Sequence, residues 1–271
     1  MHVQANGIRM WAERVGSGPA VVFIHGMTND HTLFGAQRDA FSKSYTFVAY
    51  DVRGYGQTDR VYEPPYEIDL LAADLRALLT SLGIARATLV GVSLGGLIAQ
   101  QFALKHPSMV AALVIADSVG QFSPESRAMF AERARIVKAQ GTQPLVDGIL
   151  TRWFTPEFAA QNPARIAGFR EQILANDPTT VAATCRIATT FNLLDQLASI
   201  TAPTLVLVGE HDRGNPLPKA REIQERISGA ELAVIPGAAH FGPVEQPETF
   251  NRLVLDFLNR AGVPDREASI R

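Results

Sequence analysis

The sequence predicts an α/β fold, in which a mostly parallel central sheet is flanked by helices and carries a helical insertion. Short β-branched runs alternate with helical patterns, and this alternation is typical of a parallel sheet covered on both faces. The alternation stops after Ala116, and no convincing strand appears from Ser123 to about Leu197. A chain of 271 residues, 46% of them apolar, is long enough for one large domain with an insert.

Each expected strand is a short run rich in β-branched and aromatic residues. The strands are expected at residues 20–24, 45–50, 87–90, 110–116, 203–208 and 231–235. Helical spacing of apolar residues predicts helices at about residues 68–82, 95–106, 217–227 and 245–260. An antiparallel hairpin over about residues 2–14, turning at Asn6-Gly7, is expected at one edge of the sheet.

Four prolines predict helix starts in the segment without strands. Each follows a residue whose side chain can accept a hydrogen bond at a helix cap, and proline at the first helical position loses no backbone bond. The pairs are Ser123-Pro124, Thr155-Pro156, Asn162-Pro163 and Asp177-Pro178. We therefore expect a core domain over residues 1–121 and 198–271, with a helical cap over residues 122–197 inserted after the sixth strand. Such a cap would cover the carboxyl edge of the sheet, where open α/β sheets bind ligands.

Charge and composition exclude several kinds of partner. The net charge is −2 and no basic block is present, which argues against nucleic acid or an anionic membrane surface. The single cysteine, Cys185, cannot form an internal disulfide or a structural zinc site, and no metal-ligand cluster or phosphate loop is recognisable. The N-terminus lacks a secretory pattern, so a cytoplasmic protein is expected. Residues 87–104 are uncharged, but we interpret them as a buried strand leading into a helix rather than a membrane span.

The strongest functional signal is Gly91-Val92-Ser93-Leu94-Gly95, at the predicted junction of a strand and a helix. A turn this sharp strains the serine backbone and holds its hydroxyl outward, while the glycines keep neighbouring side chains from colliding. This is the pattern of a nucleophile elbow, and it predicts that Ser93 is a catalytic nucleophile.

A serine hydroxyl needs a base to remove its proton as it attacks. Of the six histidines, His240 is the best candidate, because it follows the last strand and should reach the same edge of the sheet as Ser93. Asp212, after the strand at 203–208, is expected to orient the imidazole, which gives the chain order serine, aspartate, histidine. Asp117, at the end of the strand at 110–116, remains an alternative acid.

An oxyanion formed during attack needs hydrogen-bond donors. The backbone N–H of Met27, after the strand at 20–24, and that of Leu94, after the nucleophile, are the expected donors. Gly26 keeps the turn open in front of Met27. We interpret His25 as a residue that braces this loop rather than one that reacts.

Together these residues resemble the α/β-hydrolase superfamily over nearly the whole chain. The resemblance rests on His25-Gly26, the Asp-Val-Arg-Gly-Tyr-Gly run at residues 51–56, the serine elbow, the Gly-Glu-His-Asp run at residues 209–212, and Ala239-His240. Arg152-Trp153-Phe154 and the run at residues 192–203 are similar to the branch of 3-oxoadipate enol-lactonases and related carboxylesterases. The resemblance implies that the protein needs no cofactor and that Asp51 and Arg53 brace their loop.

The expected activity is hydrolysis of a small carboxylic ester or lactone through an acyl-serine intermediate. The aromatic residues Phe122, Trp153, Phe154 and Phe241 are expected to line the pocket, with Gly26 and Phe34 at its rim. Phe34 stands where many relatives have tryptophan. Acyl-homoserine lactone hydrolysis, carbon–carbon bond hydrolysis and cofactor-free perhydrolysis use the same three residues and remain open. A receptor of this fold with slow turnover is a further alternative, and the oligomeric state is not predicted.

Overall fold

The computed structural model describes residues 1–263 and contains an eight-stranded sheet with the order β1-β2-β4-β3-β5-β6-β7-β8. The strands β1 and β2 pair antiparallel, as do β2 and β4, and all the other pairs are parallel. The strands are β1 (His2–Ala5), β2 (Ile8–Gly16), β3 (Ala20–Ile24), β4 (Thr46–Tyr50), β5 (Ala87–Val92), β6 (Val110–Ala116), β7 (Thr204–Gly209) and β8 (Glu231–Ile235).

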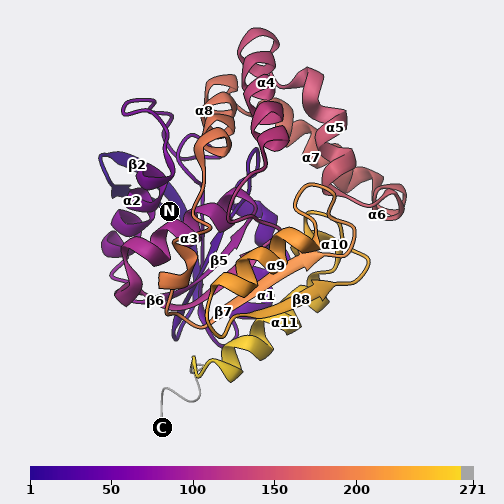
Figure 1. The fold of residues 1–271 in the computed structure, drawn as a ribbon. Helices are drawn as coiled ribbons and strands as arrows, with labels where there is room; N and C mark the ends of the chain where they lie inside the picture. Colours follow the sequence, from indigo (N-terminus) through magenta and orange to yellow (C-terminus); the bar gives the residue numbers. More distant parts are fainter. Residues whose placement is uncertain (264–271) are drawn as a thin grey trace.

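Helices cover both faces of the sheet, and the N-terminal hairpin forms one edge (Figure 1). The core helices are α1 (Gly35–Phe41), α2 (Ile68–Ser81), α3 (Leu94–Lys105), α9 (Leu217–Arg226), α10 (Gly242–Glu245) and α11 (Pro247–Arg260). The helices between β6 and β7 are α4 (Pro124–Gln140), α5 (Val146–Trp153), α6 (Pro156–Gln161), α7 (Pro163–Ala175) and α8 (Pro178–Thr190). The predicted fold class, the hairpin and all the predicted strands are confirmed.

The central strands are buried on both faces, because their alternate residues belong to two separate apolar clusters. In β3, Val22 and Ile24 pack with α2 and α3, whereas Val21 and Phe23 pack with α1 and α11. Every residue of β3, β5 and β7 is buried, as expected for the middle of a parallel sheet. The sheet is therefore a rigid base from which the loops at its carboxyl edge project.

Helices α4 to α8 lie above the carboxyl edge of the sheet in Figure 1, with α4 and α8 packed against each other. All four predicted proline starts are helix starts. Ser123, Thr155 and Asp177 cap theirs with a side-chain hydrogen bond. Asn162 does not, because its amide instead donates to the carbonyl of Phe158 in the preceding helix.

Helices α1 and α5 and the 3₁₀ turn η3 (Gln143–Leu145) were not predicted from the sequence. Residues 122–197 contain no strand, and a single bridge between Gln121 and Asn192 closes the base of this segment. We refer to residues 122–197 as the cap segment, as a proposed structural unit. The uncharged run at residues 87–104 divides into β5 and α3, as predicted, and no helix among the described residues is suited to span a membrane.

Candidate active site

The turn from β5 to α3 holds Ser93 in a strained backbone conformation. Its φ is 56° and its ψ is −115°, in a region that residues with a side chain seldom adopt. A Cβ atom at Gly91 would lie 2.2 Å from the carbonyl oxygen of Gly95, and one at Gly95 would lie 2.0 Å from that of Ile24. Only glycine fits at either position, so the space around the turn accounts for the Gly-x-Ser-x-Gly pattern.

The loops after β7 and β8 bring Asp212 and His240 together. The Nδ1–H of His240 donates to Oδ2 of Asp212 at 2.8 Å, and the N–H groups of Gly214 and Asn215 donate to Oδ1 at 2.7 and 3.0 Å. Burial would raise the pKa of Asp212, but His240 and these two N–H groups lower it below its ordinary value. The carboxylate is therefore ionised and fixed on the Nδ1 side of the imidazole, which leaves Nε2 free to accept a proton.

The close approach of these two loops depends on Gly209. A Cβ atom there would lie 1.9 Å from the carbonyl oxygen of Ala239, the residue before His240. The main chain also joins the loops, since the N–H of His211 donates to the carbonyl of Ala238 at 2.8 Å. His211 itself is exposed and lies outside this contact.

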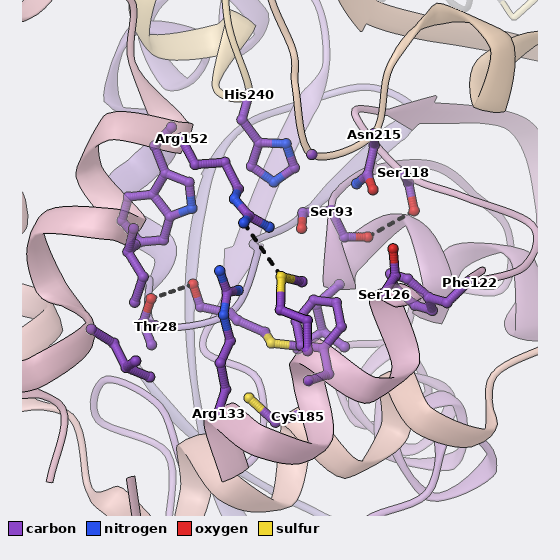
Figure 2. Close-up of a pocket in the computed structure, with 18 of the residues that line it drawn as sticks. Thr28, Ser93, Ser118, Phe122, Ser126, Arg133, Arg152, Cys185, Asn215 and His240 are labelled. Carbon is purple, nitrogen blue, oxygen red and sulfur yellow. Dashed lines mark hydrogen bonds between the residues drawn. The ribbon is translucent and has the colours of Figure 1, made fainter. Parts of the chain in front are cut away.

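Ser93 and His240 line the same pocket, and Figure 2 shows both side chains pointing into it. Within residues 1–263 the hydroxyl of Ser93 makes no hydrogen bond. Catalytic hydrogen bonds are commonly long without substrate and shorten when substrate binds. The arrangement therefore presents a free hydroxyl next to an imidazole whose other nitrogen is held by a carboxylate.

Two backbone N–H groups are candidates for an oxyanion site. Met27 and Leu94 both line the pocket, and neither N–H donates a hydrogen bond to another described residue. Gly26, which was expected at the rim, is not part of the pocket lining and lies behind Ser93, where a Cβ atom would be 3.2 Å from the Cβ of Ser93. The parallel pairing of β3 with β5 brings the turns that follow these two strands, and so Met27 and Leu94, to the same edge of the sheet.

His25 is a buried bracing residue, as its position before Gly26 suggested. Its Nδ1 lies 2.7 Å from the carbonyl oxygen of Gly26, and its Nε2 accepts the N–H of Val52 at 2.9 Å. Burial lowers the pKa of His25 and favours the neutral form that this pattern requires. Both ring nitrogens are occupied, so His25 is unavailable as a base.

The loop after β4 is also held by side chains. The carboxylate of Asp51 accepts the N–H and Nδ1–H of His31 and the N–H of Gln57, all at 2.7 to 2.8 Å. Arg53 makes a buried two-point ion pair with Asp74. One cluster here, formed by Asp30, His31 and Asp51, has the residue types and spacing of metal ligands. The hydrogen bonds that Asp51 and His31 already make explain it instead as a cluster that holds the loop in place.

The pocket is mostly apolar and is roofed by the cap segment. Its lining includes Phe122, Trp153 and Phe241, three of the predicted aromatic residues. The structure corrects the other two. Phe34 packs against Phe23 in the core at 5.1 Å between ring centroids, because the 3₁₀ turn η1 (His31–Phe34) directs it inward. Phe154 stacks on Phe158 and packs against Phe169 and Phe241, and it is not part of the lining of this pocket.

A family model described as the alpha/beta hydrolase fold matches residues 19–247. The chain belongs to the α/β-hydrolase family. This hydrolase is 31% identical over 242 residues to 3-oxoadipate enol-lactonase 2 of Acinetobacter baylyi, with 89% of each chain covered. Its fold matches that of the enol-lactonase from Burkholderia xenovorans LB400 with a TM-score of 0.91 and 28% identity, over 96% of this chain and all of that one.

A third similar protein is a thermophilic esterase from Thermogutta terrifontis, whose structure contains malate. The TM-score is 0.89 and the identity 27%, over 96% of this hydrolase and 98% of the esterase. These similarities place the hydrolase in the enol-lactonase-like branch that the motifs predicted.

Sequence reasoning missed two arginines that reach into the pocket of this hydrolase. Arg133 on α4 and Arg152 on α5 line it (Figure 2), and no aspartate or glutamate does. The guanidinium of Arg133 lies over the ring of Phe130, and that of Arg152 donates to the sulfur of Met129. Neither arginine makes an ion pair with any residue in the described range 1–263. Their direction depends on how α4 and α5 pack, which the apolar spacing of these helices did not specify.

The two arginines give the pocket an uncompensated positive charge. Burial and the nearby Arg152 lower the pKa of Arg133 to about 10, which still leaves it charged at neutral pH. Buried charges are ordinarily paired, because an unpaired one is costly to remove from water. Both arginines are partly buried, and an anionic group in the pocket would supply the ion-pair partner that they lack.

Proposed function

We propose that this hydrolase cleaves carboxylic esters or lactones through an acyl-Ser93 intermediate. One observation carries the proposal: a strained serine shares a pocket with an imidazole whose Nδ1 is held by the ionised Asp212. This is the set of groups that acyl transfer requires: a nucleophile, a base and a group that orients the base. The names of the similar proteins, enol-lactonase and esterase, support the same bond type.

In the proposed reaction, Oγ of Ser93 bonds to the substrate carbonyl carbon while its proton passes to Nε2 of His240. The carbonyl oxygen becomes an oxyanion that accepts the N–H groups of Met27 and Leu94. When the tetrahedral intermediate collapses, the bond to the alkoxy oxygen breaks and that oxygen takes the proton from His240. Asp212 stabilises the imidazolium in between and stays ionised.

Water completes the cycle. It attacks the acyl-serine carbonyl carbon and gives its proton to His240, and the carboxylic acid leaves as Ser93 regains its proton. In a lactone the alkoxy oxygen belongs to the same molecule as the acyl group, so both remain attached to Ser93 until this second step. The two oxyanion donors act in both steps, and removing one such donor typically costs about 3–4 kcal/mol in the transition state.

We further propose that the preferred substrate is anionic, with its negative group held by Arg133 and Arg152. Both arginines come from the cap segment, whereas Ser93 and His240 come from loops of the sheet. A short substrate could therefore place its reactive carbonyl at Ser93 and a carboxylate against these two arginines of the cap segment. The malate in the Thermogutta terrifontis esterase is such a carboxylate ligand in a similar protein.

The test of the acyl-serine mechanism is turnover of an activated short-chain ester by wild type, Ser93→Ala and Ser126→Ala. Ser126 carries a second hydroxyl in the same pocket, which makes it the matched control. We expect many turnovers per wild-type chain, a loss of about 10³-fold or more in kcat for Ser93→Ala, and little change for Ser126→Ala. Substantial turnover by Ser93→Ala would refute the mechanism. A single slow event per wild-type chain would instead indicate a receptor.

A further inference from the structure

Asp117 is a buried carboxyl group that the proposed reaction does not use. It follows the last residue of β6, between the end of β5, which carries Ser93, and the end of β7, which leads to Asp212. Its side chain is fully buried, and its φ is +48°, a left-handed value that costs an aspartate free energy. It makes no hydrogen bond with His240, whose Nδ1 is taken by Asp212.

Asp117 is instead attached to the loop that carries Asp212, and it is attached on both sides of that residue. Its Oδ1 accepts the N–H of Gly209 at 2.7 Å, three residues before Asp212. Its carbonyl oxygen accepts Nδ2 of Asn215 at 2.7 Å, three residues after Asp212. The N–H of Asn215 in turn donates to Oδ1 of Asp212. The main chain of Asp117 is fixed in the sheet, since its N–H donates to the carbonyl of Leu207 at 2.9 Å.

We propose that Asp117 is a positioning residue, whose carboxyl group and backbone carbonyl hold residues 209–215 at both ends and so fix the Asp212 carboxylate against His240. This inference rests on the proposed function, because that function uses His240 as the base and Asp212 as the residue that orients it. The two attachments leave the loop little freedom to move Asp212 away from the imidazole.

The surroundings of Asp117 favour the protonated form of its carboxyl group. Burial raises its pKa well above the ordinary value, and the negative charges of Asp212 and Glu245 raise it further. The N–H groups of Gly209 and Gly242 favour the ionised form but only partly offset these effects. Two carboxyl groups in one buried site do not both ionise readily, so the charge resides on Asp212, which has His240 and two N–H groups around it.

A neutral carboxyl group can be replaced by an amide of the same shape. In Asp117→Asn the side-chain oxygen still accepts the N–H of Gly209, and no charge is lost. In Asp117→Ala the attachment at Gly209 is removed. The pair of variants therefore separates the hydrogen bond from the charge, and Asn215→Ala removes the second attachment independently.

The experiment measures kcat and KM for an activated ester, and the low-field proton resonance of the His240 Nδ1–H, in wild type and the three variants. For Asp117→Asn we expect kcat within about 3-fold of wild type and an unchanged resonance. For Asp117→Ala we expect kcat to fall about 10- to 100-fold with KM nearly constant, because a small displacement of a catalytic group has effects of this size. The resonance should broaden or disappear. Asn215→Ala should likewise lower kcat and broaden or remove the resonance of the His240 Nδ1–H.

Three results would overturn the inference. If folded Asp117→Ala kept wild-type kcat and the resonance, Asp117 would have no positioning role; if this variant did not fold, the same result for Asn215→Ala would decide the matter. If Asp117→Asn lost as much activity as Asp117→Ala, the charge of Asp117 would be required. If the pH profile of Asp117→Asn shifted, the carboxyl group would be ionised in wild type. The resonance is read without substrate, so it tests the positioning even if no ester is turned over.

Discussion

At the scale of single residues, the geometry of the site depends on positions where only glycine fits. Ser93 takes its strained conformation because Gly91 and Gly95 leave room for the turn, and Asp212 approaches His240 because Gly209 has no side chain. Such strain persists only where the surrounding structure fixes it. The buried strands of the sheet provide that rigidity, and the packing of the core around the strained turn stabilises it.

The charge of the pocket gives a prediction at this scale. Arg133→Met and Arg152→Met should each lower kcat/KM for the half ester of a short dicarboxylic acid by about 10- to 100-fold, because a hydrogen bond to a charged group contributes about 1.5–3 kcal/mol. The neutral ester of the same chain length should change by less than about 3-fold. Arg135→Met is the control, since Arg135 lies on the same helix as Arg133 but is exposed and paired with Glu132.

The measurement is the ratio of kcat/KM for the two esters in each variant. Equal losses on both esters would mean that the arginines only support the packing of the cap segment. An unchanged ratio with unchanged activity would mean that no anion binds there.

Residue type and position allowed the meeting of Ser93, Asp212 and His240 at one edge of the sheet to be predicted, because each follows a recognisable strand. Arg133 and Phe154 could not be assigned in this way. A helix presents several residues toward its surroundings, and which of them faces a pocket depends on how neighbouring helices pack. The predicted position of Phe34 was wrong for a similar reason, because a short 3₁₀ turn sets the direction of its side chain.

At the scale of elements, the cap segment is joined to the loop that carries His240. The N–H of His240 donates to the carbonyl of Trp153, the last residue of α5. Glu245, in α10, accepts the N–H and hydroxyl of Thr155, the N-cap of α6, through one oxygen and the N–H of Ala239 through the other. The junction of α5 and α6 therefore cannot move without affecting the backbone next to His240.

Glu245→Gln tests this connection. An amide cannot accept through both of its terminal atoms, so one buried N–H loses its partner. Leaving a buried donor unsatisfied costs about 1–3 kcal/mol, and we expect a decrease of that size in the free energy of unfolding. We also expect a several-fold decrease in kcat. Urea unfolding and ester kinetics measure the two effects.

The matched control is Glu248→Gln, the same change at an exposed position of the next helix. Its effect should be limited to the few tenths of a kcal/mol typical of a charge near a helix N-terminus. If the two variants behaved alike, Glu245 would not join the cap segment to the loop that carries His240.

Element boundaries were predictable where the sequence marks them. Proline after a capping residue identified the starts of α4, α6, α7 and α8. Helix α5 lacks such a mark, because Leu145 precedes it and makes no side-chain cap. Its first turn is organised by the preceding 3₁₀ turn and by tertiary packing, neither of which is visible in local sequence.

At the scale of the whole molecule, strand order brings together residues that are far apart in the chain. The strands β3, β5, β6, β7 and β8 are consecutive neighbours and parallel, so the loops after them open at one edge. That edge receives Met27, Ser93, Asp117, Asp212 and His240 in turn. The alternation of strands and helices predicted the shared edge, but the order of strands within the sheet follows from the packing of both faces and had to come from the structure.

The most direct test of the account is the site at which an activated phosphonate ester reacts. Such a reagent phosphonylates an activated serine and loses its leaving group, and the product cannot be hydrolysed as an acyl group is. We expect one phosphonyl group per chain, on the peptide that contains Ser93, with ester turnover lost in proportion to labelling and no labelling of Ser93→Ala. Labelling at another residue, or full turnover by a chain labelled at Ser93, would contradict the account.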